Sequence, residues 1–365
     1  NLPLSNYKKK LKICFLSSDF REHAVSYQLY DFLIFLLKEY SDQYDFYFLY
    51  NFKIDDEITL SLKKLSKNWL NISGYSDEQV FEYIKKLSIN ILFDLNGMSE
   101  GNRISLYTSK PADILINWCG WLTSTRNDNF DFILGDKYVF ENFNKSSYSE
   151  KPLILNRIWS TISKSLIKNK PQLNKEKQDE TIFLCPQRFD KINTETILVW
   201  KNIINDKNTN KLYLLNSCYS DYFVKKRLLR KFQENNFDLN KIEFFNFNDR
   251  FSYLEFFKKV DIALDTFPYS AGTTAFELSY MLIPNITLKK NHFISNSAYS
   301  INSNLEVEAC ISSTRREYID KALELSRNKT LYKEVKKKLV NKVYHENIYD
   351  YKKFTLDFVN LFREL

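Results

Sequence analysis

Short apolar runs typical of buried β-strands recur along the whole chain, and segments with the 3.6-residue period of a helix stand between them. The first group of predicted strands is 11–17, 44–50, 89–95, 114–119 and 130–134. The second group is 181–185, 211–215, 242–247, 260–264 and 285–288. Predicted helices include 26–38, 78–87, 194–204 and 253–259. Repeated strand–helix units predict parallel sheets with helices on both faces.

A polar stretch rich in Lys and Asn, residues 160–180, separates the two groups and predicts a linker. We therefore expect an α/β fold of two doubly wound, Rossmann-like domains that face a cleft, over residues 1–159 and 181–345. The C-terminal stretch predicts further helices at 317–326 and 331–344, and residues 346–365 contain a last amphipathic helix.

The 365 residues carry a formal charge of +8, but the lysines are scattered and have acidic neighbours. This pattern predicts a modest basic surface rather than a nucleic-acid-binding face, with a phosphate-bearing ligand as the functional alternative. No apolar run reaches membrane-spanning length and no signal peptide is visible. Because the chain starts at Asn1 without a methionine, we expect it to be part of a longer protein.

Five cysteines stand far apart and form no Cys-x-x-Cys motif. Three of them lie in apolar, strand-like runs, which predicts buried, reduced thiols in a reducing compartment such as the cytoplasm.

The segment 260–281 carries the most specific signal, because a predicted strand leads through a turn at Pro268 and Gly272 into a helix that opens at Thr273. Free backbone N–H groups, the hydroxyls of Thr273 and Thr274 and the positive end of a helix dipole would suit a diphosphate. An ordinary helix N-cap explains the same residues, and both interpretations fit this segment.

Ligands of doubly wound folds bind at the carboxyl ends of the strands, where His23 and Lys191 are expected to lie. His23 is a candidate for acid–base chemistry, although a lone histidine is more often structural. Lys191 is a candidate phosphate partner, with a solvated lysine as the alternative. The chain has no Gly-x-Gly-x-x-Gly, no Gly-Lys-[Ser/Thr] and no Asp-x-Asp, and its three histidines lack metal-ligand spacing. We therefore expect no metal and no tightly bound cofactor.

Six segments, in the same order, resemble the catalytic region of the O-GlcNAc transferase and SPINDLY family (glycosyltransferase family 41). They are 11–26 (LKICFLSSDFREHAVS), 91–97 (ILFDLNG), 110–112 (KPA) with 118–121 (WCGW), 148–151 (YSEK), 189–192 (FDKI) and 264–274 (LDTFPYSAGTT). The resemblance covers nearly the whole chain. It implies a GT-B enzyme that needs no metal, inverts the anomeric centre and modifies protein side chains.

Carried over residue by residue, the resemblance implies a role for His23 near the sugar and the acceptor, and for Lys191 at the leaving diphosphate. It places Thr273 and Thr274 at the phosphate and Glu277 at the ribose hydroxyls. The remaining donor-side positions that it implies are Gln187, Tyr253, Gly272 and Gly120, with Tyr253 where the family often has a histidine over the base. Possible acceptor-side positions are Asp19, Asn96 and Trp121.

Departures from the family pattern leave the donor open among UDP-GlcNAc, GDP-fucose and UDP-glucose. The chain has Gly120-Trp-Leu where Gly-Tyr-Pro is usual, and Gly272 where many O-GlcNAc enzymes have a histidine. Gln187-Arg188 stands where two amides are common, and Asn296 where an arginine is common. The helical repeats that present acceptors in the family are not found in this chain, and whether the longer protein carries them N-terminal to it stays open.

The sequence thus predicts a cytoplasmic protein O-glycosyltransferase region, with a nucleotide-sugar donor on the second domain and a polypeptide Ser or Thr approaching His23. UDP or GDP would be the product. Asp19 or a chain of waters is the alternative general base. Two other functions stay open: a sugar-nucleotide-binding module without turnover, and a GT-B enzyme with a saccharide or lipid acceptor.

Overall fold

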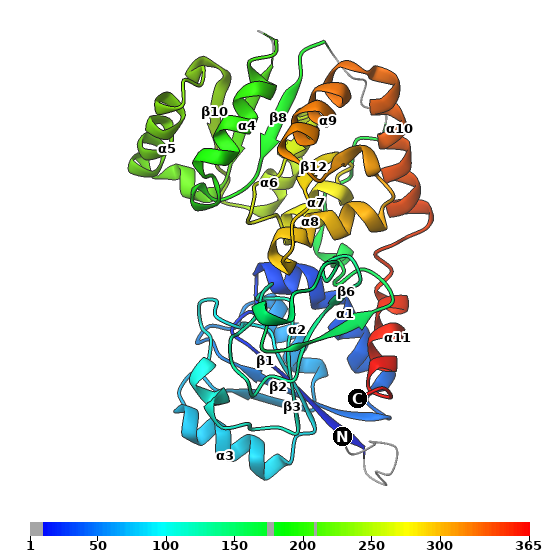
Figure 1. The fold of residues 1–365 in the computed structure, drawn as a ribbon. Coiled ribbons are helices and arrows are strands. Elements are labelled where there is room, and N and C mark those ends of the chain that lie inside the picture. Colours follow the sequence, from blue (N-terminus) through cyan, green and yellow to red (C-terminus); the bar gives the residue numbers. More distant parts are fainter. Residues whose placement is uncertain (1–9, 174–178, 208–209) are drawn as a thin grey trace. The chain divides into compact units, whose positions relative to one another are not determined.

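The computed structural model of the chain describes residues 10–173, 179–207 and 210–365. The chain divides into two compact α/β units (Figure 1). The first unit contains Asn1–Leu166 and Tyr349–Leu365, and the second contains Ile167–Ile348. None of the helices in the described ranges combines the length and the apolar character needed to cross a membrane.

The first unit is built on a seven-stranded sheet in the order β3-β2-β1-β4-β5-β6-β7, and every neighbouring pair is parallel. Its helices are α1 (Ala24–Tyr40), α2 (Glu57–Leu65) and α3 (Asp77–Leu87). The strand order reverses between β1 and β4, which is where doubly wound folds bind ligands. The strands are β1 (Leu11–Ser17), β2 (Tyr44–Tyr50), β3 (Asn68–Asn71), β4 (Ile91–Asp94), β5 (Ile114–Asn117), β6 (Phe132–Asp136) and β7 (Lys151–Leu155).

The second unit has a six-stranded parallel sheet in the order β10-β9-β8-β11-β12-β13, which reverses between β8 and β11. The strands are β8 (Ile182–Cys185), β9 (Lys211–Leu215), β10 (Ile242–Phe245), β11 (Ile262–Leu264), β12 (Asn285–Leu288) and β13 (Ile311–Ser312). The helices are α4 (Thr194–Ile204), α5 (Tyr222–Glu234), α6 (Arg250–Phe256), α7 (Thr273–Tyr280), α8 (Phe293–Asn304), α9 (Arg315–Arg327) and α10 (Lys329–Val340).

The last helix, α11 (Tyr351–Leu361), packs on the sheet of the first unit, although it is the end of the chain. The ring of Phe358 lies 4.9 Å from Phe32, 5.0 Å from Phe93 and 5.1 Å from Trp118, between ring centroids. All four side chains are fully buried. Aromatic burial of this extent makes α11 an integral part of the first core.

The boundary between the units lies inside the stretch that the sequence analysis assigns to a linker. Ser160, Thr161 and Ser163 are buried, and the Ser163 hydroxyl accepts a hydrogen bond from the backbone N–H of Asp31 at 3.1 Å. Residues up to Leu166 therefore belong to the first unit. Their polarity suggested a linker, but hydrogen bonds within the first unit satisfy these polar groups: Ser163 bonds to α1, Thr161 to Tyr349 O, and Ser160 pairs with Cys119 Sγ.

Two doubly wound parallel-sheet units confirm the predicted fold class, and β1, β2, β9 and β12 occupy the predicted residues. The apolar pattern did not predict β3, β7 and β13. The first two are the edge strands of the first sheet, and β13 is an edge strand of the second sheet. Buried parallel strands produce continuous apolar runs, whereas β3 (NWLN) is only half-buried and β7 (KPLIL) contains a proline. Edge strands therefore lack the signal that identified the central ones.

The aromatic cluster under α11 predicts a large effect of shortening Phe358. Phe358→Ala should lower the free energy of unfolding of the first unit by about 3–5 kcal/mol, because it leaves a cavity among three rings. Leu356→Ala is the matched control on the same helix, since Leu356 is 52% exposed. Urea unfolding followed by tryptophan fluorescence measures both variants, and equal effects would show that α11 is not part of this core.

Candidate functional site

A buried hydrogen-bond network joins the carboxyl ends of β1 and β4 at the reversal point of the first sheet. The Asn96 side chain accepts from Ser18 N at 2.7 Å and donates to Ser18 Oγ at 2.7 Å and to Asp19 Oδ2 at 3.1 Å. Asp94 accepts from the backbone N–H groups of Asn96 and Gly97 at 3.2 and 2.9 Å. Asn96 was predicted on the acceptor side. Because it is fully buried, it cannot contact an acceptor directly and instead holds the Asp19 carboxylate in position.

His23 stands at the edge of this network, as the N-cap of α1. Its Nδ1 lies 3.4 Å from Asp19 Oδ2 and also 3.4 Å from the backbone nitrogen of Val25. Burial lowers the pKa of His23 below its ordinary value, although the Asp19 carboxylate opposes this change. The lowered pKa favours the neutral imidazole, and with 37% of its side chain exposed the ring is accessible from solvent.

Two glycines allow the loops after β4 and β5 to meet. A Cβ on Gly120 would lie 1.8 Å from the backbone oxygen of Leu95, and one on Gly97 would lie 2.2 Å from Cβ of Trp121. Gly97 also has a φ of 56°, in the left-handed region that favours glycine. Gly120 and Trp121 thus lie beside the Asn96 loop, and the Trp121 indole N–H donates to Ser124 O at 3.2 Å.

In the second unit, Lys191 lies at the carboxyl end of β8, in a short 3-10 turn before α4. Its Nζ donates to Gln187 Oε1 at 3.0 Å and to the backbone oxygen of Ser270 at 3.1 Å, and it lies 4.0 Å from the centroid of the Tyr269 ring. Gln187 is buried, and its Nε2 has no hydrogen-bond partner within the part of the chain that the structure describes. Lys191 and Gln187 therefore bring a positive charge and an unused buried donor to one place.

The loop that brings Ser270 to Lys191 is folded around the buried carboxylate of Asp265, which follows β11. Asp265 accepts from Ala271 N at 2.9 Å, Ser270 Oγ at 2.6 Å and Thr287 Oγ1 at 2.9 Å. Burial raises the pKa of Asp265, and these hydrogen bonds and the charge of Lys191 oppose the rise. Burial likewise lowers the pKa of Lys191 to about 8, and Asp265 opposes that change.

The same loop ends at Gly272, the N-cap of α7, so Thr273 and Thr274 form the first turn of that helix, as predicted from sequence. Both threonines are partly accessible. Glu277, one turn further, is buried and forms an ion pair with Arg250. Tyr253 belongs to the same group, because burial raises the pKa of its hydroxyl well above the ordinary value and the nearby Glu277 carboxylate raises it further.

The structure thus gathers the predicted residues into two groups, one in each unit. His23, Asp19, Asn96, Gly120 and Trp121 lie at the reversal point of the first sheet. The second group lies at the reversal point of the second sheet and comprises Gln187, Lys191, Tyr253, Gly272, Thr273, Thr274 and Glu277.

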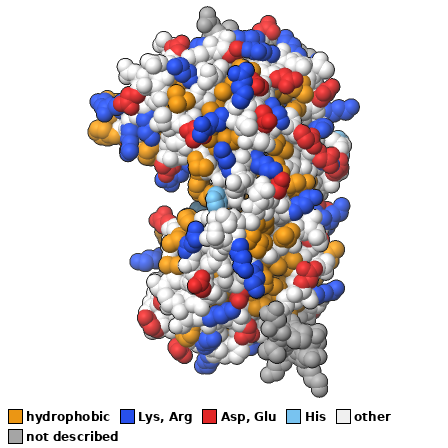
Figure 2. All heavy atoms as spheres, viewed as in Figure 1, with side chains coloured by type: hydrophobic (Ala, Val, Ile, Leu, Met, Phe, Trp, Pro, Cys, Tyr) orange, Lys and Arg blue, Asp and Glu red, His pale blue; other side chains and the backbone are white. Residues whose placement is uncertain are grey.

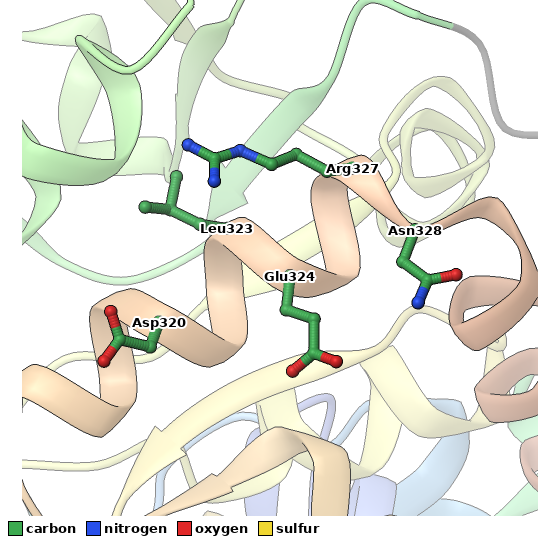
Figure 3. Close-up of a pocket in the computed structure, with 5 residues that line it drawn as sticks. All are labelled: Asp320, Leu323, Glu324, Arg327 and Asn328. Carbon is green, nitrogen blue, oxygen red and sulfur yellow. The ribbon is translucent and has the colours of Figure 1, made fainter.

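A surface depression of about 470 Å³ lies at the second group, lined by Arg188, Asp190, Lys191 and Tyr269. Another, of about 340 Å³, lies on α9, and Figure 3 shows that its side chains project from one helix and the residue after it. Arg327 in that depression pairs with Asp206, which follows α4 and precedes β9. It therefore lies toward the amino ends of the strands, and only the first depression is placed where such folds bind ligands.

No group of three or more His, Cys, Asp or Glu side chains that could hold a metal ion occurs in residues 10–173, 179–207 and 210–365. The five cysteines are free thiols, four of them buried and Cys218 half-buried.

Comparison with known proteins now identifies the family. A profile of the family described as Glycosyl transferase family 41 matches residues 2–160 and 160–358. The chain belongs to glycosyl transferase family 41. The resemblance drawn from the six sequence segments is thereby confirmed.

Curated relatives of this family-41 chain include two plant proteins. The chain is 20% identical over 372 residues to the probable UDP-N-acetylglucosamine–peptide N-acetylglucosaminyltransferase SPINDLY of Solanum lycopersicum, a match that covers 98% of this chain and 39% of that protein. It is 22% identical to the probable UDP-N-acetylglucosamine–peptide N-acetylglucosaminyltransferase SEC of Arabidopsis thaliana, over 91% of this chain and 34% of that protein. The chain therefore spans little more than a third of these relatives.

Solved structures support the fold. A mutant of the Thermobaculum terrenum O-GlcNAc transferase superposes with a TM-score of 0.89 at 23% identity, over 98% of this chain and 67% of that one. Anabaena HepE in complex with UDP and glucose superposes with a TM-score of 0.58 at 10% identity, over 97% of this chain and all of that one. The predicted GT-B class of the family-41 chain is confirmed by these likenesses.

Arg250, Asp265 and Tyr269 were missed by the sequence reasoning. Arg250 precedes Tyr253 by three residues, so helical spacing alone could have placed both on one face of α6. Asp265 and Tyr269 lie within the quoted segment 264–274, but only their contacts show that one holds the loop and the other covers Lys191.

The lowered pKa of Lys191 predicts a specific pH dependence of stability. The unfolded chain holds the Lys191 proton up to about pH 10.4, whereas the folded chain loses it near pH 8, so Lys191 lowers stability below pH 8 and this cost disappears as pH rises. The free energy of unfolding of the native chain, relative to Lys191→Met, should therefore increase by about 1–3 kcal/mol between pH 7 and pH 10.

Urea unfolding at several pH values measures this difference. The control is Lys67→Met, the same substitution at an exposed position of the first unit. If the difference for Lys191→Met does not change with pH, Lys191 is as solvated as an ordinary surface lysine.

Proposed function

We propose that this chain is the catalytic region of a glycosyltransferase that moves a sugar from a nucleotide donor to a Ser or Thr hydroxyl of a polypeptide. Membership of family 41 supports the reaction class. The names of the curated relatives support a peptide acceptor. The observation that carries the proposal is the convergence, at the reversal point of the second sheet, of Lys191 Nζ and of Gln187 Nε2, which has no hydrogen-bond partner among the described residues.

The donor diphosphate is assigned to Lys191, Gln187 and the start of α7. The leaving nucleoside diphosphate gains negative charge as the bond to the sugar breaks, and a fixed ammonium group stabilises that charge most where water is excluded. Ser270 O holds Lys191 within reach of the loop that ends at Gly272. Thr273 and Thr274 add hydroxyl donors at the positive end of the α7 dipole.

The nucleoside is assigned to the group formed by Tyr253, Glu277 and Arg250. A carboxylate is a good acceptor for ribose hydroxyls, and a phenol ring offers a stacking face for a base. Arg250 pairs with the Glu277 carboxylate, and Glu277 lies one turn of α7 after Thr273 and Thr274, so a single helix carries the proposed nucleoside and phosphate positions.

His23 is assigned to the acceptor hydroxyl. Its Nδ1 cannot both donate to Asp19 and accept from Val25 N–H. Only the tautomer that donates to Asp19 leaves Nε2 as a base, and Asn96 holds Asp19 in position for it. The acceptor oxygen then attacks the anomeric carbon with inversion, its proton passes to His23 Nε2, and the electron pair of the broken C–O bond leaves with the diphosphate.

We further propose that the reaction needs no metal and takes place in the cytoplasm. The ammonium of Lys191 and the α7 dipole supply the charge that a divalent ion supplies in other enzymes. UDP-GlcNAc is the first donor to test because the relatives' names specify it, with GDP-fucose and UDP-glucose as alternatives.

A donor panel tests this proposal. The chain is incubated with each of the three nucleotide sugars and a Ser/Thr-rich peptide, with and without EDTA, and the peptide is weighed by intact-mass spectrometry. One donor should add one sugar mass, at the same rate with EDTA. Loss of transfer on adding EDTA would contradict metal independence. Nucleotide binding without any mass shift would instead assign the chain as a sugar-nucleotide-binding module without turnover. Transfer to a saccharide or lipid but not to the peptide would assign it as a glycosyltransferase with that acceptor.

The assignment of His23 predicts separable effects on transfer and binding. His23→Ala should lower the transfer rate about a hundredfold or more, as expected for loss of a general base, while affinity for the nucleoside diphosphate stays unchanged. Lys191→Ala should lower both nucleotide affinity and transfer. Calorimetry and the mass assay measure both quantities.

Because His23 also caps α1, His23→Asn serves as the control, since asparagine keeps the cap without providing a base. Transfer at the native rate in His23→Asn would assign the base to Asp19 or to water. Lost nucleotide affinity at native stability in His23→Ala would place His23 on the donor side.

A further inference from the structure

Helix α5 of the second unit presents two neighbouring aromatic rings to solvent. Tyr222 is 64% exposed and Phe223 is 76% exposed, and their ring centroids lie 5.5 Å apart. Exposed Phe and Tyr side chains that contact each other at a helix start are unusual on a surface that has no partner. The rings belong to neither of the two groups of site residues described above.

The same helix is strongly basic. Its thirteen residues contain five cations and one acid, Glu234: the cations are Lys225, Lys226, Arg227, Arg230 and Lys231. Lys226, Arg227 and Arg230 are exposed and share the outer face of the helix with the two rings, as their spacing requires. Figure 2 shows basic and hydrophobic side chains together at the edge of the molecule where Figure 1 labels α5.

The inner face holds the helix firmly. Leu228 and Phe232 are fully buried, and Phe232 packs against Phe237 with centroids 4.8 Å apart. Asp221 caps the first turn by accepting from Phe223 N at 2.7 Å and Val224 N at 3.2 Å. The outer side chains are thus displayed by a rigid helix and can be changed without disturbing the core.

We propose that the outer face of α5, namely Tyr222, Phe223, Lys226, Arg227 and Arg230, docks on an anionic lipid bilayer. Aromatic rings enter the headgroup region, while lysine and arginine side chains contact lipid phosphates. A stable protein interface needs about 800 Å² per partner with a continuous apolar centre, whereas here two rings stand within a field of cations. That mixture complements a charged lipid surface better than it complements a protein groove.

Vesicle sedimentation tests the proposal on the whole chain. Binding is compared between vesicles of phosphatidylcholine alone and vesicles of phosphatidylcholine mixed with phosphatidylserine. The native chain should bind the mixed vesicles only, and added salt should weaken the binding. Lys226→Glu/Arg230→Glu should lower the partition coefficient at least about tenfold, and Tyr222→Ser/Phe223→Ser should lower it severalfold.

The matched control is Lys85→Glu/Lys86→Glu on α3, which makes the same charge change at exposed positions of the first unit. This control should bind like the native chain, and circular dichroism checks that all variants are folded. Absence of binding to the mixed vesicles, or an equal loss in the control, would overturn the proposal. Binding to polyglutamate that requires Tyr222 and Phe223, with none to vesicles, would instead assign the face to an acidic polypeptide. Sugar transfer to a soluble peptide should be unchanged in the α5 variants, so this outcome is independent of the proposed function.

Discussion

The buried carboxylate of Asp265 is the group on which the proposed donor site depends. It receives four hydrogen bonds, three from the loop and one from Thr287 on β12, and thereby fixes the path from the end of β11 to Gly272. The backbone oxygen of Ser270 then points at Lys191, and the opposite charges of Asp265 and Lys191 reduce the cost of burying each other. Hydrogen bonds from α8 add to this, since Ser297 Oγ donates to Ala271 O and Ala298 N donates to Ser270 Oγ.

The first unit uses the same device at its own reversal point. Asp94 binds the backbone at Asn96 and Gly97, and Asn96 binds Ser18 and Asp19, so the loops after β1 and β4 are locked to each other. His23 and Arg21 both contact Asp19 from the edge of this buried network, and both are partly exposed. Both units thus place buried polar groups beneath accessible charged or titratable side chains, which is the arrangement that a pre-organised site requires.

Besides the two groups of site residues, the chain carries the face of α5 that we propose to bind a membrane. The helix starts after β9, close to the loop of Gln187, since Tyr219 donates to the backbone oxygen of Gln187 at 3.0 Å and Arg227 lies 6.0 Å from the Phe189 ring. A bilayer bound by α5 would therefore lie near the donor loop of the same unit. Such docking would bring the proposed active site close to acceptor proteins at a membrane.

The sequence by itself determined the fold class, because buried parallel strands must be short and apolar and helices must carry one apolar face. It also placed His23, Lys191 and Thr273 correctly at the carboxyl ends of strands, since chain order fixes which residues follow each strand. Sequence analysis did not predict edge strands such as β3, because a half-buried strand has no continuous apolar run.

Only the tertiary structure decided which of these residues share a group. The sequence separates Asp19 from Asn96 by 77 residues and Lys191 from Ser270 by 79, and no local pattern records such contacts. Burial, too, exists only in the packed chain. Asn96 is buried and therefore positions Asp19 without reaching solvent, and burial lowers the pKa of Lys191. Packing also brings Glu277 against Arg250. Local order along the chain follows from residue type, whereas proximity and desolvation exist only after the sheets have assembled.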